Sequence, residues 1–336
     1  MAKRVGKRTI FLEKDVSIKA SAGVVGKKEG EGPLSSFFDK IFEDEYLGQE
    51  TFEAAESVLV KTAVTLATKK ANVEMSDVDL VTIGDLLNQS MASTYAVKDY
   101  ELPLIGLFGA CSTCALSLGL GSLLVESGVA KNLVAATSSH FCTAERQFRF
   151  PLEYGSKCTP NSQRTVTGAG ASVVALGGGI VKIRAVTFGK VKDYDIKDAN
   201  NMGAAMAPAA ADTIKAYFDD TGAKPTDFDL ILTGDLGKVG STLLNELLFE
   251  KGIDISSVHN DCGTMIFDVN DKDFAAGGSG CGCSASVFYT YVMDKFKKSE
   301  FSRILFIGTG ALLSPTSTNQ GLSIPSIAHL VEIAQG

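Results

Sequence analysis

Apolar residues recur along this chain in two patterns, one typical of buried strands and one typical of the helices that cover them. Short apolar runs predict strands at Thr9–Leu12, Val16–Ala20, Val78–Ile83, Leu104–Phe108, Leu133–Thr137, Thr165–Gly177, Lys182–Phe188, Leu230–Leu232 and Ile304–Ile307. Apolar positions at helical spacing predict helices at Glu50–Lys70, Cys111–Glu126, Ala207–Phe218, Ser241–Glu250 and Cys281–Lys297. The stretches Gly26–Pro33 and Phe141–Gln163 read as loops, and no further element is predicted after Ile307. This alternation predicts an α/β fold whose sheets are covered by helices on both faces.

The two halves of the chain share the same succession of segments. Asp79–Leu86 reads DLVTIGDL, and Asp229–Leu236 reads DLILTGDL. The turn Gly109–Ser112 is matched about 170 positions later by Gly278–Cys281, and each turn leads into a helix and then a strand. Repetition of three elements in one order predicts duplication of one α/β unit, with Cys111 and Cys281 at equivalent points.

Length and composition agree with two such units. The chain has 336 residues, of which 45% are hydrophobic, so it can bury a large core. We place the boundary between the glycines at 177–179, which divides the chain into residues 1–178 and 179–336. The net charge of −7 gives no sign of nucleic-acid binding.

One uncharged segment, Leu102–Val125, is long enough to span a bilayer. Pro103, several glycines and clustered Ser, Thr and Cys favour instead a strand, a tight turn and a buried helix. The basic start of the chain is not followed by an apolar segment, so we expect no signal peptide. The sequence predicts a soluble or at most peripheral protein.

Seven cysteines include the close pairs Cys111/Cys114 and Cys281/Cys283. They lie among Gly, Ala, Ser and Leu, and the chain has only three histidines, so neither a zinc site nor a disulfide framework is expected. Cys111 follows a short apolar strand and opens a helix. A helix N-terminus lowers the pKa of a thiol and can also bind a carboxylate, although a small buried side chain is the alternative.

The run Gly109–Ser112, the helix ending at Gly128, the strand Leu133–Ser138 and the strand at Gly168–Ala171 together resemble the superfamily of thiolases and ketoacyl-acyl-carrier-protein synthases III. The resemblance implies a thiolase-like fold of two duplicated βαβαβ halves with pseudo-two-fold symmetry, layered α-β-α-β-α. It also implies a homodimer, and it places Cys111 at the acyl-accepting cysteine.

The residues that assist this cysteine in the enzymes are not found at the matching positions of this chain. Synthase III enzymes present His-Gln-Ala-Asn after the repeat strand, where this chain has Gly234–Gly237, and their second partner falls at Cys281. Loss of an oxyanion donor costs about 10²–10³ in rate. We therefore expect no enzymatic activity and no catalytic residue.

Several phrases resemble one family, stage V sporulation protein AD of spore-forming bacteria, and the resemblance covers essentially the whole chain. The phrases are Gly84–Gln89, Ser138–Phe141, Ala144–Arg149 and Thr165–Ala171. The resemblance implies a non-enzymatic protein, without cofactor or metal of its own, that binds dipicolinic acid (pyridine-2,6-dicarboxylate) or its calcium chelate. It further implies membrane-protein partners that load the ligand into the developing spore and release it at germination. The expected location is peripheral, at the spore inner membrane, or otherwise the forespore cytoplasm.

We predict that the ligand is bound by residues of the turns before the two repeated helices, by the aspartates of the repeat and by polar residues of the segments named above. These residues are Asp85, Asn88, Cys111, His140, Arg146, Arg149, Asp235 and Cys281. Arginine suits bidentate pairing with a carboxylate, whereas an aspartate needs calcium or the acid form of the ligand. Structural alternatives stay open, since His140 can be a bonded strand-end group, the arginines surface charges and the aspartates turn caps.

Two other functions remain in view. An acyltransferase would use Cys111 with an unconventional partner such as His140 or His259, and thioester labelling of the cysteine would reveal it. A scaffold that only docks membrane partners would not bind dipicolinate.

Overall fold

The computed structural model describes residues 2–148 and 159–336. Its strands are β1 (Lys3–Val5), β2 (Thr9–Phe11), β3 (Val16–Val25), β4 (Lys40–Ile41), β5 (Leu80–Gly84), β6 (Leu104–Gly106), β7 (Asn132–Ser139), β8 (Arg164–Thr165), β9 (Gly168–Leu176), β10 (Val181–Thr187), β11 (Leu230–Thr233), β12 (His259–Asp261), β13 (Gly278–Ser279), β14 (Arg303–Ala311) and β15 (Ser326–Gln335). Its α-helices are α1 (Lys27–Gly30), α2 (Phe52–Ala71), α3 (Met91–Val97), α4 (Thr113–Ser127), α5 (Phe141–Phe148), α6 (Met202–Thr221), α7 (Gly237–Phe249), α8 (Cys262–Ile266), α9 (Cys281–Val287), α10 (Met293–Lys297) and α11 (Pro315–Asn319).

Each half builds the same five-stranded order. The first half runs β6-β5-β7-β9-β3 and the second runs β12-β11-β14-β15-β10. In both, the first two pairings are parallel and the next two antiparallel. The halves join where β3 and β10 pair antiparallel over two positions. The predicted duplication is therefore confirmed at the level of strand order and direction.

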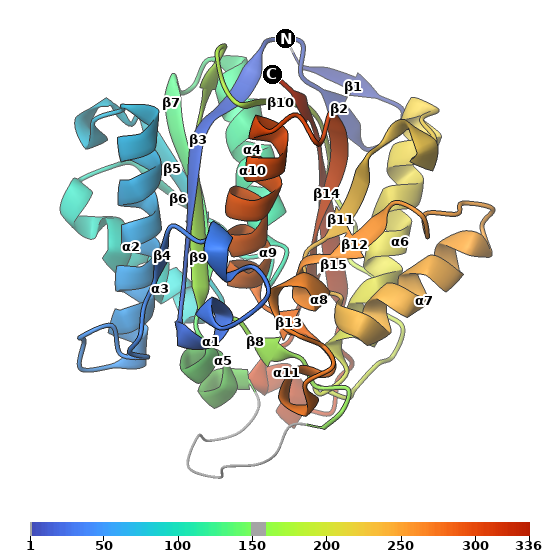
Figure 1. Cartoon of the computed structure of the whole chain (residues 1–336). Coiled ribbons are helices and arrows are strands. Elements are labelled where there is room, and N and C mark those ends of the chain that lie inside the picture. Colours follow the sequence, from blue (N-terminus) through green and yellow to red (C-terminus); the bar gives the residue numbers. More distant parts are fainter. Residues whose placement is uncertain (1, 149–158) are drawn as a thin grey trace.

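The elements stack in five layers (Figure 1). Helices α4, α9 and α10 lie between the two groups of strands, α2 covers the outer face of one group, and α6 and α7 cover the other. The central helices bury large side chains such as Leu118, Phe288 and Phe296 in one core cluster. The predicted thiolase-like fold with α-β-α-β-α layers is confirmed.

One segment of the described residues, Ala110–Ser127, is long and apolar enough to cross a membrane, but 72% of it is buried inside the protein. Its position explains its composition: it forms the turn before α4 and α4 itself, and α4 contacts β5, β7, β14 and β15 from the central layer. The helix is apolar all round because it packs on sheets at both sides.

The repeated aspartates Asp79 and Asp229 make equivalent contacts. Asp79 Oδ2 accepts hydrogen bonds from the amides of Lys131 and Asn132 at 2.7 and 2.9 Å. Asp229 Oδ2 accepts from the amides of Ser302 and Arg303 at 2.6 and 2.9 Å. In each half, one carboxylate thus holds the loop that enters the neighbouring parallel strand, β7 or β14.

Several segments differ from the prediction, including the short elements α3, β12, α8 and α11, which the sequence did not predict, and three of the differences bear on the argument. Phe141–Gln163, predicted as a loop, begins with helix α5, whose two turns are too short for a clear helical period. Gly26–Pro33 contains helix α1, and its Glu29 is buried because the carboxylate accepts the Thr167 amide at 3.0 Å.

The third difference is β15, which the sequence did not predict after Ile307. This strand pairs with both β14 and β10, and it carries the fully buried Glu332. Glu332 is paired with Arg303 at 2.8 Å and accepts the Tyr217 hydroxyl at 2.8 Å. Because this acid interrupts the apolar residues in the middle of the strand, the sequence pattern did not indicate a strand here. The predicted boundary between residues 178 and 179 falls in the turn between β9 and β10.

Candidate functional site

A tight turn places Cys111 just before helix α4. Ala110 has φ 49°, and the Ser112 and Thr113 amides bond back to the carbonyls of Gly109 and Ala110 at 3.1 and 3.2 Å. The side chains of Ser112 and Thr113 repeat these contacts at 2.6 and 2.7 Å. A non-glycine residue with positive φ persists only where its surroundings hold it.

Strand β14 packs directly against this turn. A Cβ atom on Gly310 would lie 2.2 Å from the Gly109 carbonyl oxygen, so only glycine lets the strand approach so closely. The turn of the first half is therefore held by a strand of the second half.

The Cys111 thiol is buried beside a carboxylate. Cys111 is 5% exposed, and the charge of the neighbouring Asp235 acts on its thiol. Burial, and then the charge of Asp235, raises the pKa of this thiol well above its usual value. This corrects the expectation of a depressed pKa: desolvation and a neighbouring acid outweigh the effect of the helix N-terminus.

Asp235 is anchored by three groups. Its Oδ2 accepts from the Gly280 amide at 2.8 Å and the Ser279 hydroxyl at 3.3 Å, and its Oδ1 accepts from the Thr309 hydroxyl at 2.8 Å. Burial raises the pKa of Asp235 to about 6, although these donors and Cys111 favour its charged form. The resemblance to synthase III enzymes placed a catalytic partner position at Gly234. In the structure, the polar side chain that acts on Cys111 belongs to the next residue, Asp235.

Cys281 lies on the other side of the site with two more buried carboxyl groups. Its thiol donates to the Ser138 carbonyl at 2.9 Å, and burial raises its pKa well above the usual value. Burial and the nearby Asp85 raise the pKa of Glu56 to about 8, and burial also raises the pKa of Asp85. The region around the two cysteines therefore disfavours additional negative charge.

A narrow apolar cavity opens beside Cys111. Its free volume is about 30 Å³, close to the share of one water molecule in the liquid. The lining is mostly apolar and comes from both halves: Leu86, Phe108, Ala110, Cys111, Ala144, Phe148, Thr165, Met202, Ser279, Ala311 and Leu313. A ring-sized ligand can enter only if some of these side chains rotate.

Comparison with known proteins identifies the family. Residues 6–334 match the family described as stage V sporulation protein AD. A protein of that name from Bacillus subtilis (strain 168) is 44% identical over 327 residues, which cover 97% of this chain and 96% of the relative. This chain belongs to the stage V sporulation protein AD family.

Solved structures relate the fold of this family member to acyl-transfer enzymes. A 3-oxoacyl-[acyl-carrier-protein] synthase III from Aquifex aeolicus VF5 matches with a TM-score of 0.56 at 14% identity, over 95% of this chain and 99% of that one. Human mitochondrial 3-ketoacyl-CoA thiolase matches with a TM-score of 0.59 at 13% identity, over 97% and 99%. At such low identity the likeness shows the fold alone.

The remaining predicted ligand residues that the structure describes are not among the residues that line the cavity. His140 Nε2 bonds the Glu45 carbonyl at 2.8 Å, its Nδ1 accepts the Cys142 amide at 3.1 Å, and burial lowers its pKa. Arg146 is paired with Glu53 and lies over the Phe52 ring. These contacts agree with the structural alternatives given above, in which His140 is a bonded group at a strand end and Arg146 is a surface charge.

Asn88 accepts a hydrogen bond from Gln147 at 3.2 Å on the surface. Asp85 accepts the Leu87 and Ser93 amides, both at 2.8 Å, and the Ser93 hydroxyl at 2.6 Å. Asp85 thus caps the loop that carries the lining residue Leu86. Arg149 lies outside the described residues.

The alternative catalytic partner His259 is also engaged elsewhere. Its Nε2 lies 3.0 Å from the Thr233 hydroxyl and its Nδ1 lies 3.1 Å from the Asn245 amide nitrogen, and burial lowers its pKa to about 4. Sequence reasoning missed Phe148, Met202 and Leu313 in the cavity, because they come from a helix end, a helix start and a loop with no shared motif. It could have found Ser279 and Gly280 as functional, since they belong to the repeated turn.

Proposed function

We propose that this protein binds dipicolinate in the cavity beside Cys111, without catalysing a reaction, and serves the transport of this ligand during sporulation and germination. The burial of the Cys111 thiol beside the carboxylate of Asp235 carries the proposal. Acyl transfer needs a base or an oxyanion donor beside the thiol, whereas Asp235 keeps the thiol protonated. A site that retains the cavity but suppresses the nucleophile is suited to binding.

The electrostatics of the cavity favour a ligand without net charge. No cationic side chain is among the described residues that line it. Burial raises the pKa values of the neighbouring Asp235, Asp85 and Glu56, and the same desolvation disfavours entry of a free dicarboxylate. The acid form or the neutral calcium chelate fits better, after rotation of Phe108, Phe148 or Met202.

Further parts of the proposal concern assembly. We propose membrane-protein partners of the same transport complex, with peripheral attachment at the spore inner membrane. We also propose a homodimer built at β6, the edge strand of the first half, where Leu104 is 38% exposed and Phe108 is 54% exposed. An apolar sheet edge of this kind favours pairing with a second copy.

Isothermal titration calorimetry with dipicolinate, with and without calcium chloride, tests the proposal. Wild-type protein should give saturable binding, and Cys111→Ala should weaken it. Absence of binding heat under both conditions would contradict the proposal. The remaining function would then be that of a scaffold that docks membrane partners. Formation of a covalent adduct at Cys111 with an acyl thioester, detected by mass spectrometry, would favour the acyltransferase instead.

A further inference from the structure

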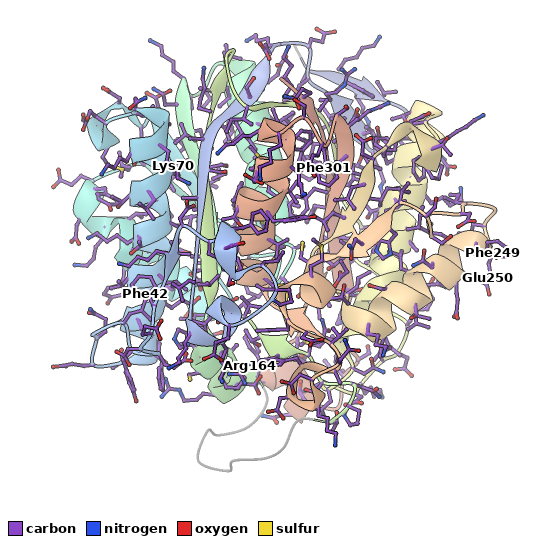
Figure 2. All side chains as sticks on the ribbon, viewed as in Figure 1. Phe42, Lys70, Arg164, Phe249, Glu250 and Phe301 are labelled. Carbon is purple, nitrogen blue, oxygen red and sulfur yellow. The ribbon has the colours of Figure 1, made fainter. Side chains whose placement is uncertain are left out.

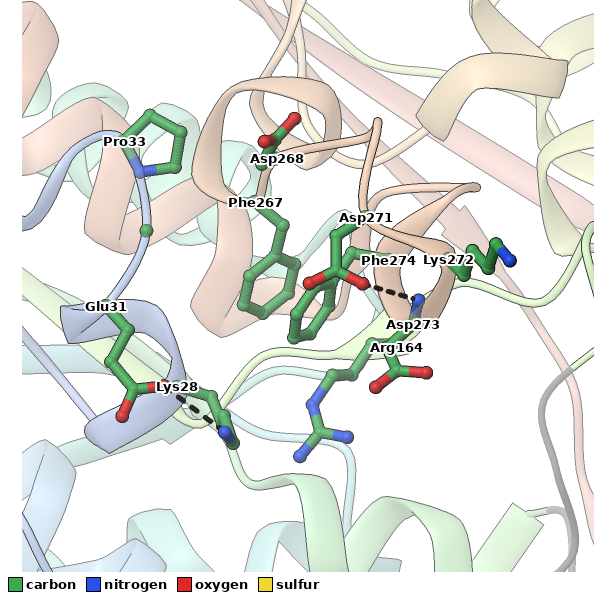
Figure 3. A pocket seen from close by; sticks show the side chains of 11 residues that line it. Lys28, Glu31, Pro33, Arg164, Phe267, Asp268, Asp271, Lys272, Asp273 and Phe274 are labelled. Atoms are coloured by element: carbon green, nitrogen blue, oxygen red, sulfur yellow. Dashed lines mark hydrogen bonds and ion pairs between the residues drawn. The ribbon is translucent and has the colours of Figure 1, made fainter.

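The largest cavity of the described residues lies on the far side of strand β8 from Cys111. Its volume is about 870 Å³, within the range of small-molecule sites. It is bounded by helix α1, by Arg164 of β8 and by residues 267–274 (Figure 3). Figure 2 places Arg164 near the lower end of the molecule, close to α1 and α5. Nothing in the proposed dipicolinate site beside Cys111 uses this space.

Arg164 is held between aromatic rings but has no anionic partner. Its guanidinium carbon lies 3.8 Å from the centre of the Phe141 ring and 5.8 Å from that of Phe274. Its Nε atom is buried and makes no hydrogen bond. Within the described ranges, no acidic side chain forms an ion pair with it. The side chain as a whole is half-buried and lines the cavity, so its guanidinium can pair with a carboxylate there.

The same cavity provides a flat apolar surface. The rings of Phe267 and Phe274 are stacked with centroids 4.4 Å apart and planes at 17°. Both rings line the cavity next to Arg164, as Figure 3 shows. Phe267 is only 2% exposed and supports the half-buried Phe274 ring, so a planar aromatic ligand would meet the pair mainly at Phe274 while its carboxylate reaches the guanidinium.

The charges of the rim limit what can bind. The lining contains three cationic side chains, including Lys28, and four acidic ones, including Asp271. The net field therefore does not attract a free dianion, although Arg164 can satisfy one carboxylate. An aromatic dicarboxylate whose second charge is neutralised by calcium meets both conditions.

Strand β8 forms a thin wall between this cavity and the one beside Cys111. Arg164 lines the larger cavity, and its neighbour Thr165 lines the smaller. Successive side chains of a strand point to opposite faces, which explains how two adjacent residues serve two cavities. β8 is held by β13, with the Arg164 and Val166 amides bonded to the carbonyls of Gly277 and Ser279 at 3.0 and 2.8 Å.

We propose that the Arg164 cavity is a second binding site, which takes a planar aromatic carboxylate with its ring on Phe267 and Phe274 and prefers the calcium chelate to the free dianion. The identity of the ligand as dipicolinate rests on the proposed function. The Arg164 cavity provides a cationic side chain, which the described lining of the Cys111 cavity lacks.

Calorimetry with dipicolinate plus calcium chloride tests this site. Wild-type protein should show two binding events per chain, and Arg164→Gln should weaken one of them roughly tenfold or more. Arg164→Lys, which keeps the charge but loses the planar fork, should weaken it less. The control Lys272→Gln removes a charge from the rim of the same cavity and should change affinity by less than about fivefold. Leaving out calcium should weaken the Arg164-dependent event.

The outcomes separate the two proposals. If Arg164→Gln changes nothing while Cys111→Ala removes all binding, the second site is wrong and the proposed function stands. If Arg164→Gln removes the single event and Cys111→Ala has no effect, the second site stands and the Cys111 site is wrong. Absence of binding to wild type overturns both proposals. If calcium does not strengthen the Arg164-dependent binding event, the preference for the calcium chelate is wrong.

If the Arg164 variants do not fold, hydrogen exchange on wild type decides. Addition of dipicolinate and calcium should protect the amides of residues 267–274. Bound ligand without protection of this segment overturns the second site.

Discussion

The thiol of Cys111 is buried beside the carboxylate of Asp235, and these residues come from different halves of the chain. Asp235 in turn is held by the Gly280 amide and the Thr309 hydroxyl. A helix N-terminus alone would favour the thiolate, but burial and the neighbouring carboxylate favour the thiol.

Asp235→Asn should make Cys111 more reactive. The substitution removes the negative charge that raises the thiol pKa, and the rate of alkylation below the pKa rises roughly tenfold for each unit by which the pKa falls. Time-resolved mass spectrometry after addition of iodoacetamide at pH 8 measures the rate. Cys142, which is half-buried and has a pKa raised to about 11, serves as internal control in the same sample. Equal rates at Cys111 in variant and wild type would show that Asp235 does not control the thiol.

Gly310→Ala should displace the turn that holds Cys111. The new methyl group would meet the Gly109 carbonyl oxygen at 2.2 Å, so strand or turn must move. We expect a loss of stability of about 2 kcal/mol in chemical denaturation, together with weaker dipicolinate binding. Gly106→Ala is the control, because its Cβ would meet only Leu104 at 3.6 Å. Similar effects of both substitutions would refute the role of the close contact.

Glu56→Gln should stabilise the protein at alkaline pH relative to wild type. Burial and Asp85 raise the pKa of Glu56 from 4.5 to about 8, so the folded state keeps its proton where the unfolded chain has lost it. The stability that this proton binding provides is present below the unfolded pKa and is lost as the pH rises through about 8. Between pH 6 and pH 9, the free energy of unfolding of the variant should rise relative to wild type by roughly 2–3 kcal/mol, because each pH unit between 6 and 8 costs wild type about 1.4 kcal/mol.

Urea denaturation across this pH range measures the difference. Glu74→Gln, on the exposed surface, should track wild type at every pH. A Glu56→Gln profile parallel to that of wild type would mean that Glu56 is ionised in the folded protein at neutral pH.

Asp79→Ala and Asp229→Ala should destabilise the protein to a similar extent. Each removes a carboxylate that accepts two backbone amides at 2.6–2.9 Å. We expect about 1 kcal/mol for each and near-additivity in the double variant, because the two loops lie in separate halves. Thermal unfolding checks this, with Glu74→Ala as control. Strongly unequal losses would mean that the two repeats hold their loops differently.

Leu104→Lys should weaken the proposed homodimer. The side chain lies on the edge strand β6, and a lysine there discourages pairing with a second copy. Sedimentation velocity of wild type and variant over a range of concentrations measures the shift toward monomer. Lys131→Leu, on an exposed loop before β7, controls for a general change in charge. A monomeric wild type would refute the homodimer itself.

The fold could be predicted from the sequence because its signals are local and repeated. Asp79–Leu86 and Asp229–Leu236 revealed two copies of one strand and turn, and the structure places them at equivalent strands β5 and β11. The unbroken helix at Cys281–Lys297 was also predicted correctly, as α9 and α10 joined by the π-helical turn Phe288–Val292. β15 was missed because its buried Glu332 depends on Arg303, a partner 29 residues away in sequence.

The site could be predicted only in part. Cys111 and Asp235 were singled out by the repeated turns and strand ends, and the structure brings them together. His140 and Arg146 looked like ligands because their charge or polarity suits a carboxylate, yet nearby partners at Glu45 and Glu53 already engage them. Arg164 was not singled out at all. Its unpaired guanidinium depends on rings at Phe141 and Phe274, which come near it only in the folded chain.

The two-stranded pairing of β8 with β13 joins one segment from each repeat. A single ancestral repeat, folding by itself, would lack this partition and both hollows that it separates. Both cavities therefore need the two halves together. For the same reason, cutting the chain at the boundary between the halves should abolish ligand capture by either fragment, even if each retains its own strands.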